Sequence, residues 1–106
     1  MKLYRLDEMK DGWFVGNFEP TCLRTNVFEV ASKKYKTGDR ESRHVHQIAT
    51  EITVIASGRV IMKGQIFEKG DIIVVDPGEA ADFQVLEDAL TVVVKIPSAI
   101  GDKHLV

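Results

Sequence analysis

Residues 38–58 read GDRESRHVHQIATEITVIASG, and the two histidines inside this stretch decide how the chain is interpreted. His44 and His46 are one residue apart, so they share a face if the segment is a β-strand, in which side chains alternate. Glu51 follows five residues after His46 and can join the pair after a tight bend. Two imidazoles and one carboxylate form a facial metal triad with open positions for substrate or oxygen. The stretch therefore predicts a metal-centred pocket.

Short β-like runs surround this stretch and are separated by glycine and proline turn signals. Lys63-Gly64 is typical of a tight hairpin, Ser57-Gly58 indicates a turn, and Pro97 ends the last run because proline cannot donate to a ladder. Several short strands of this kind predict an all-β sandwich or barrel. The expected strands are 27–36, 43–47, 51–56, 59–62, 65–68, 71–75, 81–86 and 90–96.

Length and composition exclude several classes of protein. The 106 residues fit one domain, and 44% hydrophobic with 28% charged residues is typical of a globular protein. The net charge of -2 comes without a basic stripe, which gives nucleic-acid binding no support. Cys22 is the single cysteine, so a disulfide within the chain is excluded. No apolar signal region or membrane-length run is present, and we expect a cytoplasmic protein that does not bind membranes.

Two strands are apolar on both faces, which predicts contact with a partner. Residues 72–75 and 91–94 lack the alternation of a half-solvated strand, so both faces must be covered. In a chain this small a second copy can supply one cover, and we expect a homodimer. Residues 1–25 have weak periodicity; they form an edge strand, an arm across the dimer, or ordinary packing on their own barrel.

The spacing around the histidines matches a known pattern. Gly38, then His44 and His46, Glu51 and Gly58 resemble the first motif of the cupin superfamily, with the family's spacing at each step. The resemblance implies a double-stranded β-helix, which is a small jelly-roll barrel and often dimeric, over a single domain of residues 1–106. In typical cupins two histidines and a glutamate of this motif bind a divalent metal together with a histidine of a second motif.

Residues 70–83 resemble the second cupin motif more loosely. The opening glycine and Gly78 fall in place, but Pro77 sits one residue later than the motif's proline. Ala81 stands where the motif has its histidine, and Asp82 could replace that ligand only if the strand is shifted by one residue. Such a shift would turn every side chain of the strand to the opposite face. Because the apolar residues of this segment alternate with Asp82, we expect the carboxylate to point to solvent.

The resemblance implies that His44, His46 and Glu51 hold a divalent metal ion, with iron, manganese, nickel and zinc as candidates. Iron in the two-histidine, one-carboxylate geometry keeps three open positions, and zinc with three protein ligands and a water is equally possible. The alternative is a relic of the metal site. In that case one histidine pairs with Glu51 inside a metal-free ligand pocket.

A few further residues are candidates for contact with a ligand. Lys95 interrupts an apolar run; it either enters a polar cavity and meets an anionic ligand, or carries its ammonium to water at the strand end. Thr53 has the parity of Glu51 and can line the same cavity, where its hydroxyl would orient a substrate. Arg43 should point away from His44 to the surface. His104 lies in a segment for which a solvated tail is the default.

Two functions of different classes remain open from the sequence. The first is a metal-dependent enzyme of the cupin type, a dioxygenase or isomerase, acting on a small metabolite such as a sugar or an organic acid. The second is a non-catalytic cupin that binds a saccharide-like molecule with a degenerate metal site. The missing histidine of the second motif and the lack of a further acid–base pair support the second, and the fold itself does not choose. We favour a small metal-binding cupin with possible metabolic enzyme activity.

Overall fold

The chain folds almost entirely into β-strands, and the computed structural model describes all 106 residues. One short 3₁₀ turn, η1 (Leu6–Glu8), comes first. The all-β prediction is confirmed, and no helix is long and apolar enough to span a membrane. The strands are β1 (Trp13–Gly16), β2 (Leu23–Arg24), β3 (Glu29–Tyr35), β4 (Arg40–His46), β5 (Thr50–Met62), β6 (Gln65–Glu68), β7 (Ile72–Val75), β8 (Ala80–Ile96) and β9 (Lys103–Leu105).

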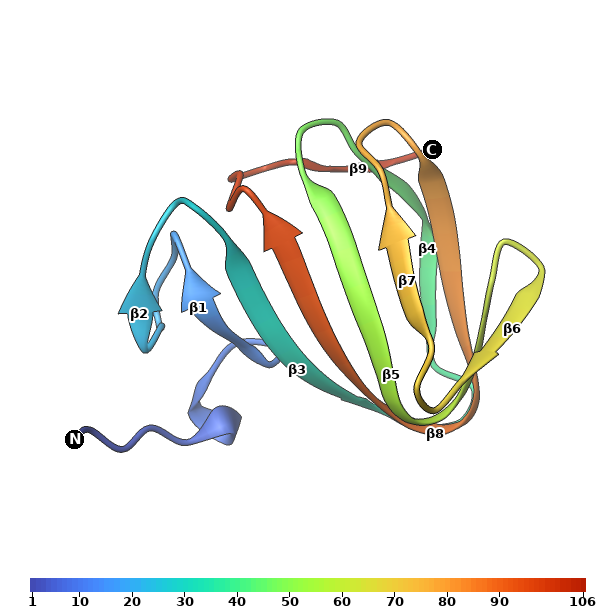
Figure 1. The fold of residues 1–106 in the computed structure, drawn as a ribbon, viewed down its shortest axis with the longest axis horizontal. Coiled ribbons are helices and arrows are strands. Elements are labelled where there is room, and N and C mark those ends of the chain that lie inside the picture. The colour runs from blue at the N-terminus through green and yellow to red at the C-terminus, as the bar shows by residue number, and fades with distance from the viewer.

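Two long strands, β5 and β8, connect the two layers of the molecule. The second half of β8 pairs with β3 on one side and with the first half of β5 on the other. The first half of β8 pairs with β4 and with the second half of β5. One layer therefore runs β2-β1-β3-β8-β5-β7, and the other runs β9-β4-β8-β5-β6. Figure 1 shows β5 and β8 descending together and bending at the lower end of the view.

The sequence divided each of these long strands in two, and that prediction was wrong. β5 continues through Ser57-Gly58, with shifts in its register to β8 between Ile55 and Val60. Gly58 has a φ of +84°, and a Cβ at this position would lie 2.2 Å from the carbonyl oxygen of Asp88. The glycine therefore marks a bulge at which the two long strands cross between layers, because only a residue without a Cβ fits there.

The predicted hairpin at Lys63-Gly64 is confirmed. Met62 pairs with Gln65, and both loop residues have positive φ, 50° and 75°, as a type I′ turn requires. The strand before Pro97 also ends where proline predicts, because β8 stops at Ile96.

The C-terminal segment is ordered rather than a solvated tail. Residues 103–105 form β9, which pairs with β4. In this ladder His44 is the register partner of Leu105, and His46 is the register partner of Lys103. His104 faces Val45 in this ladder and is exposed. Periodicity could not reveal a strand of three residues, since alternation needs a longer run to stand out.

The apolar core lies between the layers and adjoins the candidate site. The core is formed by Ile55, Val60, Met62, Val75, Ala81, Phe83, Val85 and Ala89. At the edge of the first layer, β1 pairs with β3 in antiparallel fashion and with β2 in parallel fashion. The N-terminal residues thus contribute the edge of this sheet, as Figure 1 also shows.

The outer face of the first layer is apolar as well. Ile52 of β5 lies between Val74 of β7 and Val94 of β8, and Val54 is flanked in the same way one pair further along. Ile72 and Val74 are 65% and 54% exposed. Nothing within the chain covers this surface, which we call the outer apolar face: Ile52, Val54, Ile72, Val74, Val92 and Val94.

Candidate metal centre

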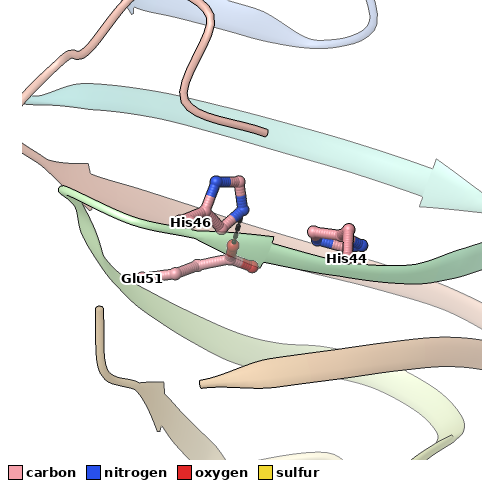
Figure 2. Close-up of side chains that lie close together, drawn as sticks. All are labelled: His44, His46 and Glu51. Carbon is pink, nitrogen blue, oxygen red and sulfur yellow. Dashed lines mark ion pairs between the residues drawn. The ribbon is translucent and has the colours of Figure 1, made fainter. Parts of the chain in front are cut away.

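The structure brings His44, His46 and Glu51 together at one end of the barrel interior. Alternation along β4 places both imidazoles on its inner side, and the three-residue loop after β4 returns the chain so that Glu51 enters at the start of β5. One ligand atom from each residue lies within 4.8 Å of the others. Figure 2 shows Glu51 directed at His46, with the His44 ring beside them.

His46 and Glu51 form the closest contact of the cluster. Nε2 of His46 lies 3.1 Å from Oε2 of Glu51, and their side chains are only 5% and 17% exposed. The two atoms are not aligned for a hydrogen bond, so this buried nitrogen has no hydrogen-bond partner. Buried polar nitrogens are normally satisfied, and a ring nitrogen left in this way next to a carboxylate oxygen is suited to share a cation with it.

His44 is oriented by its own strand. Its Nδ1 lies 2.8 Å from the carbonyl oxygen of Ser42. A carbonyl oxygen only accepts, so in the neutral ring Nδ1 carries the proton and Nε2 keeps the lone pair. Metal-binding histidines are typically held in this way, with the second nitrogen donating to a carbonyl or carboxylate. The contact therefore prepares His44 to be a ligand through Nε2.

Glu51 is held as a carboxylate. Burial raises its pKa, but His46 and Lys95 more than offset burial, and the pKa lies below its usual value. Thr53, two residues along the same face of β5, donates its hydroxyl to Oε1 of Glu51 at 3.2 Å. Thr53 is itself buried, so its side chain fixes the carboxylate from inside the protein.

Asp102 holds the loop that links the two histidines to Glu51, and sequence reasoning missed it. Its carboxylate accepts the backbone N–H groups of Gln47, Ile48 and Ala49 at 2.9 to 3.2 Å. The side chain is buried, with the residue 6% exposed. The contacts span more than 50 residues of chain, so no local pattern announces them. In the sequence, only its position directly after Gly101 could have drawn attention to this aspartate.

The position at which the cupin resemblance led us to expect a fourth ligand is apolar. Ala81 faces His44 across the β4–β8 ladder and is 5% exposed. Asp82, the next residue, is exposed and accepts the backbone N–H of Lys63 at 2.8 Å. Its carboxylate is thus engaged by the β5–β6 hairpin, and the residue lies at the rim of the cavity outside the three-residue cluster.

A cavity of about 1000 Å³ opens onto the cluster. Thr53 and Lys95 line it together with the three candidate ligands, whereas Arg43 is exposed on the opposite side of β4. Lys95 does not reach bulk water at the strand end: its side chain is 16% exposed and faces Glu29 and Glu51 across the ladders. Burial lowers the pKa of Lys95, and the two carboxylates act against that effect without cancelling it.

The residues present fit a divalent metal ion. Two neutral imidazoles and one carboxylate are the ligand types of both zinc and non-haem iron sites. The unpartnered nitrogen of His46 and the orientation of His44 by Ser42 are the features that such a site needs. Ligand atoms around one ion lie roughly 3 Å apart when bonds are about 2.1 Å, so the widest pair of the cluster has to close by a side-chain rotation.

No protein-family model and no curated protein matches the chain. The fold does match solved structures. A protein with a double-stranded β-helix domain from Klebsiella pneumoniae aligns with a TM-score of 0.71 at 21% identity, covering 98% of this chain and 90% of that one. KdgF from Halomonas sp. aligns with a TM-score of 0.65 at 21% identity, over 72% and 74% of the two chains.

A third match carries the name of the fold family. It is a sugar phosphate isomerase from a cupin superfamily, from Silicibacter pomeroyi, with a TM-score of 0.61 at 19% identity, covering 66% of this chain and 50% of that one. The strand order, the two shared long strands and these matches agree with one another. The chain therefore has the double-stranded β-helix fold that these structures share.

Proposed function

We propose that this protein binds a divalent metal ion through His44, His46 and Glu51 and is a metal-dependent enzyme acting on a small metabolite. The observation that carries the proposal is the cluster itself: three ligand atoms within 4.8 Å of one another at the wall of a 1000 Å³ cavity. A cavity of this size suits a sugar or an organic acid, because small-molecule sites typically measure about 300–1000 Å³.

The residues around the cluster have separate tasks in this proposal. A bound ion would supply Lewis-acid chemistry, by which it polarises an oxygen of the substrate. Thr53 holds the Glu51 carboxylate, and Ser42 sets the tautomer of His44. Ala81, which stands where the family's fourth ligand would be, leaves an apolar wall that can receive the body of a substrate. Phe83 continues this wall two residues further along β8.

The fold matches do not decide the reaction type by themselves. One similar structure is a sugar phosphate isomerase, and the cupin barrel hosts several chemistries. We infer isomerisation or dioxygenation as the reaction, and both can be screened with sugars and organic acids once the metal is known.

The first experiment measures metal content by elemental mass spectrometry on untagged protein purified without chelator. We expect near-stoichiometric iron, manganese, nickel or zinc in the parent protein and its loss in His46→Ala and Glu51→Ala. His104→Ala is the matched control, because it removes an exposed histidine outside the cluster. The fold of His46→Ala should persist, since the core residues Ile55, Val60 and Val85 do not line the cavity. Equal metal content in His46→Ala and the parent would show that the ligand set is wrong.

A second candidate function needs no ion. The 3.1 Å approach of His46 to Glu51 can also be an ion pair inside a pocket that binds a saccharide-like molecule without catalysis. The same experiment separates the two functions. Protein that is purified empty and does not take up added metal would favour the binding protein.

A further inference from the structure

One wall of the cavity carries two ammonium groups over a single aromatic ring. Nζ of Lys33 lies 5.1 Å and Nζ of Lys95 lies 4.8 Å from the centroid of the Trp13 ring. The side chains of the two lysines are only 18% and 16% exposed. All three residues line the cavity that opens onto the metal cluster. Two positive charges are thus concentrated in a largely buried place.

Neither ammonium uses its donors within the protein. The nearest carboxylate oxygens are those of Glu41, 3.9 Å from Lys33, and Glu29, 3.8 Å from Lys95. These distances exceed the roughly 3.2 Å limit of a good N–H···O bond. The exposed Lys63, by contrast, reaches Glu79 at 2.9 Å. Glu29 is further committed to Ser98, whose hydroxyl donates to its second oxygen at 2.8 Å.

A third polar group at this wall is also unpartnered. The hydroxyl of Thr91 is buried, with the residue 1% exposed, and it has no hydrogen-bond partner. Thr91 lies directly opposite Lys33 in the β3–β8 ladder and lines the same cavity. A buried hydroxyl without a partner is costly unless something in the cavity satisfies it. Two ammonium groups that have only distant carboxylates as partners, together with this hydroxyl, can donate hydrogen bonds to the oxygens of a compact anion.

We propose that Lys33 and Lys95 bind the anionic group of the substrate, a carboxylate or a phosphate, and that the rest of the molecule reaches the metal cluster. The substrate class is therefore a small organic anion. The statement that its other end reacts at the metal cluster rests on the proposed function. The anion site itself rests on the lysine pair and does not need a metal. Lys95 lies opposite Glu51 in the β5–β8 ladder, so the anion would sit beside the ion that Glu51 helps to hold.

Trp13 provides the measurement, because it is the only tryptophan of the chain and lies beneath both ammonium groups. Chelator-treated parent protein is titrated at constant ionic strength with malonate, inorganic phosphate and the neutral malonamide, while tryptophan fluorescence is recorded. We expect a saturable change with malonate, with phosphate or with both, and none with malonamide. The anion that binds more tightly identifies the carboxylate or the phosphate as the group recognised.

Variants assign the site to the two lysines. Lys33→Met and Lys95→Met should each weaken anion binding by about ten-fold or more, because each removes charge-assisted hydrogen bonds. Lys95→Arg should retain most of the affinity, and circular dichroism checks the fold of every variant. Lys69→Met is the matched control, since Lys69 is exposed and does not line the cavity. Unchanged affinity in both methionine variants, or an equal response to malonamide, would overturn the proposal.

Glu51→Gln separates this inference from the proposed function. The substitution removes a metal ligand and also a negative charge opposite Lys95, so we expect it to abolish metal binding and to keep or strengthen anion binding. Anion binding by a parent protein that is purified empty and takes up no added metal would leave the anion site standing while the metal function fails. Loss of anion binding in Glu51→Gln would show that the anion is not held by the lysines, and the inference would fail.

Discussion

Asp102 is the residue whose removal tests how the metal cluster is positioned. Its carboxylate accepts the amides of three consecutive residues in the loop between the histidines and Glu51. Asp102→Asn keeps the size of the side chain but turns an amide NH₂ toward these donors. We expect a loss of about 2 kcal/mol in the free energy of unfolding, since hydrogen bonds to charged groups contribute about 1.5–3 kcal/mol.

The same variant should change metal affinity and the response of stability to pH. Metal affinity should fall by about ten-fold, because outer partners of ligands typically contribute that much. Burial raises the pKa of Asp102, but the amides of Ala49, Ile48 and Gln47 outweigh it and hold the pKa below its usual value. The stabilisation is thus fully present above the unfolded pKa of about 3.9 and is lost as pH falls through the lower folded pKa. Urea unfolding of the parent protein and of Asp102→Asn between neutral and acidic pH measures this stabilisation. A difference in the free energy of unfolding that stays the same at every pH would contradict the assignment.

At the residue scale the sequence predicts what depends on near neighbours and misses what depends on distant ones. His44, His46 and Glu51 lie within eight residues, so strand alternation for the histidines and a tight bend before Glu51 were enough to predict the cluster. Asp102 contacts the loop across more than 50 residues of chain, and the Ser42 contact with His44 uses a backbone carbonyl, which no residue type signals. The sequence marked Lys95 as unusual, but it left open whether the ammonium enters the cavity or reaches water. The structure decides this, because the ammonium lies over the Trp13 ring.

At the scale of elements, the crossing of β5 and β8 depends on Gly58. Gly58→Ala would place a Cβ 2.2 Å from the carbonyl oxygen of Asp88 and force a positive φ on an L-residue. We expect the free energy of unfolding to fall by about 3 kcal/mol from strain and overpacking together. Gly64→Ala is the matched control: it also has a positive φ but meets nothing within 4 Å, so about 1 kcal/mol is expected. Urea unfolding measures both variants. Equal losses in the free energy of unfolding would show that the two strands are not closely packed at Gly58.

The existence of most strands could be predicted, but the continuity of the longest ones could not. Six of the apolar runs became parts of β5, β6, β7 and β8 because composition and alternation are local properties. A glycine after a β-like run indicates both a turn and a bulge, and the decision between them depends on the partner strand. Here that partner is the segment near Asp88. The prediction of a turn at Gly58 was wrong, because β5 continues through it.

At the scale of the whole molecule, the outer apolar face leads us to propose a homodimer. Ile72 and Val74 are more than half exposed and adjoin further apolar residues of β5 and β8. The face carries no charge, so two copies can meet on it without repulsion, and a stable interface needs about 800 Å² from each partner. Dimerisation stays a prediction from the lack of alternation in the sequence.

Light scattering coupled to size-exclusion chromatography tests the dimer. The parent protein should elute as a dimer, and Val74→Glu should be a monomer, because a carboxylate buried in an apolar interface is costly. Ile66→Glu is the control, since Ile66 is exposed on β6 outside the outer apolar face. A monomeric parent, or a dimer in Val74→Glu, would contradict the proposal.

The two sides of the site differ in local stability, because one of them depends on the short strand β9. β8 is hydrogen-bonded on both sides along most of its length, whereas β9 is three exposed residues at the edge of β4. Amide hydrogens should therefore exchange fastest in β9 and slowest in β8. We expect that opening of this edge releases Asp102 from the loop first and loosens the imidazoles, while the part of the site around Lys95 stays in place. Thermal fluctuation would thus release a bound ion well before it unfolds the protein that held it.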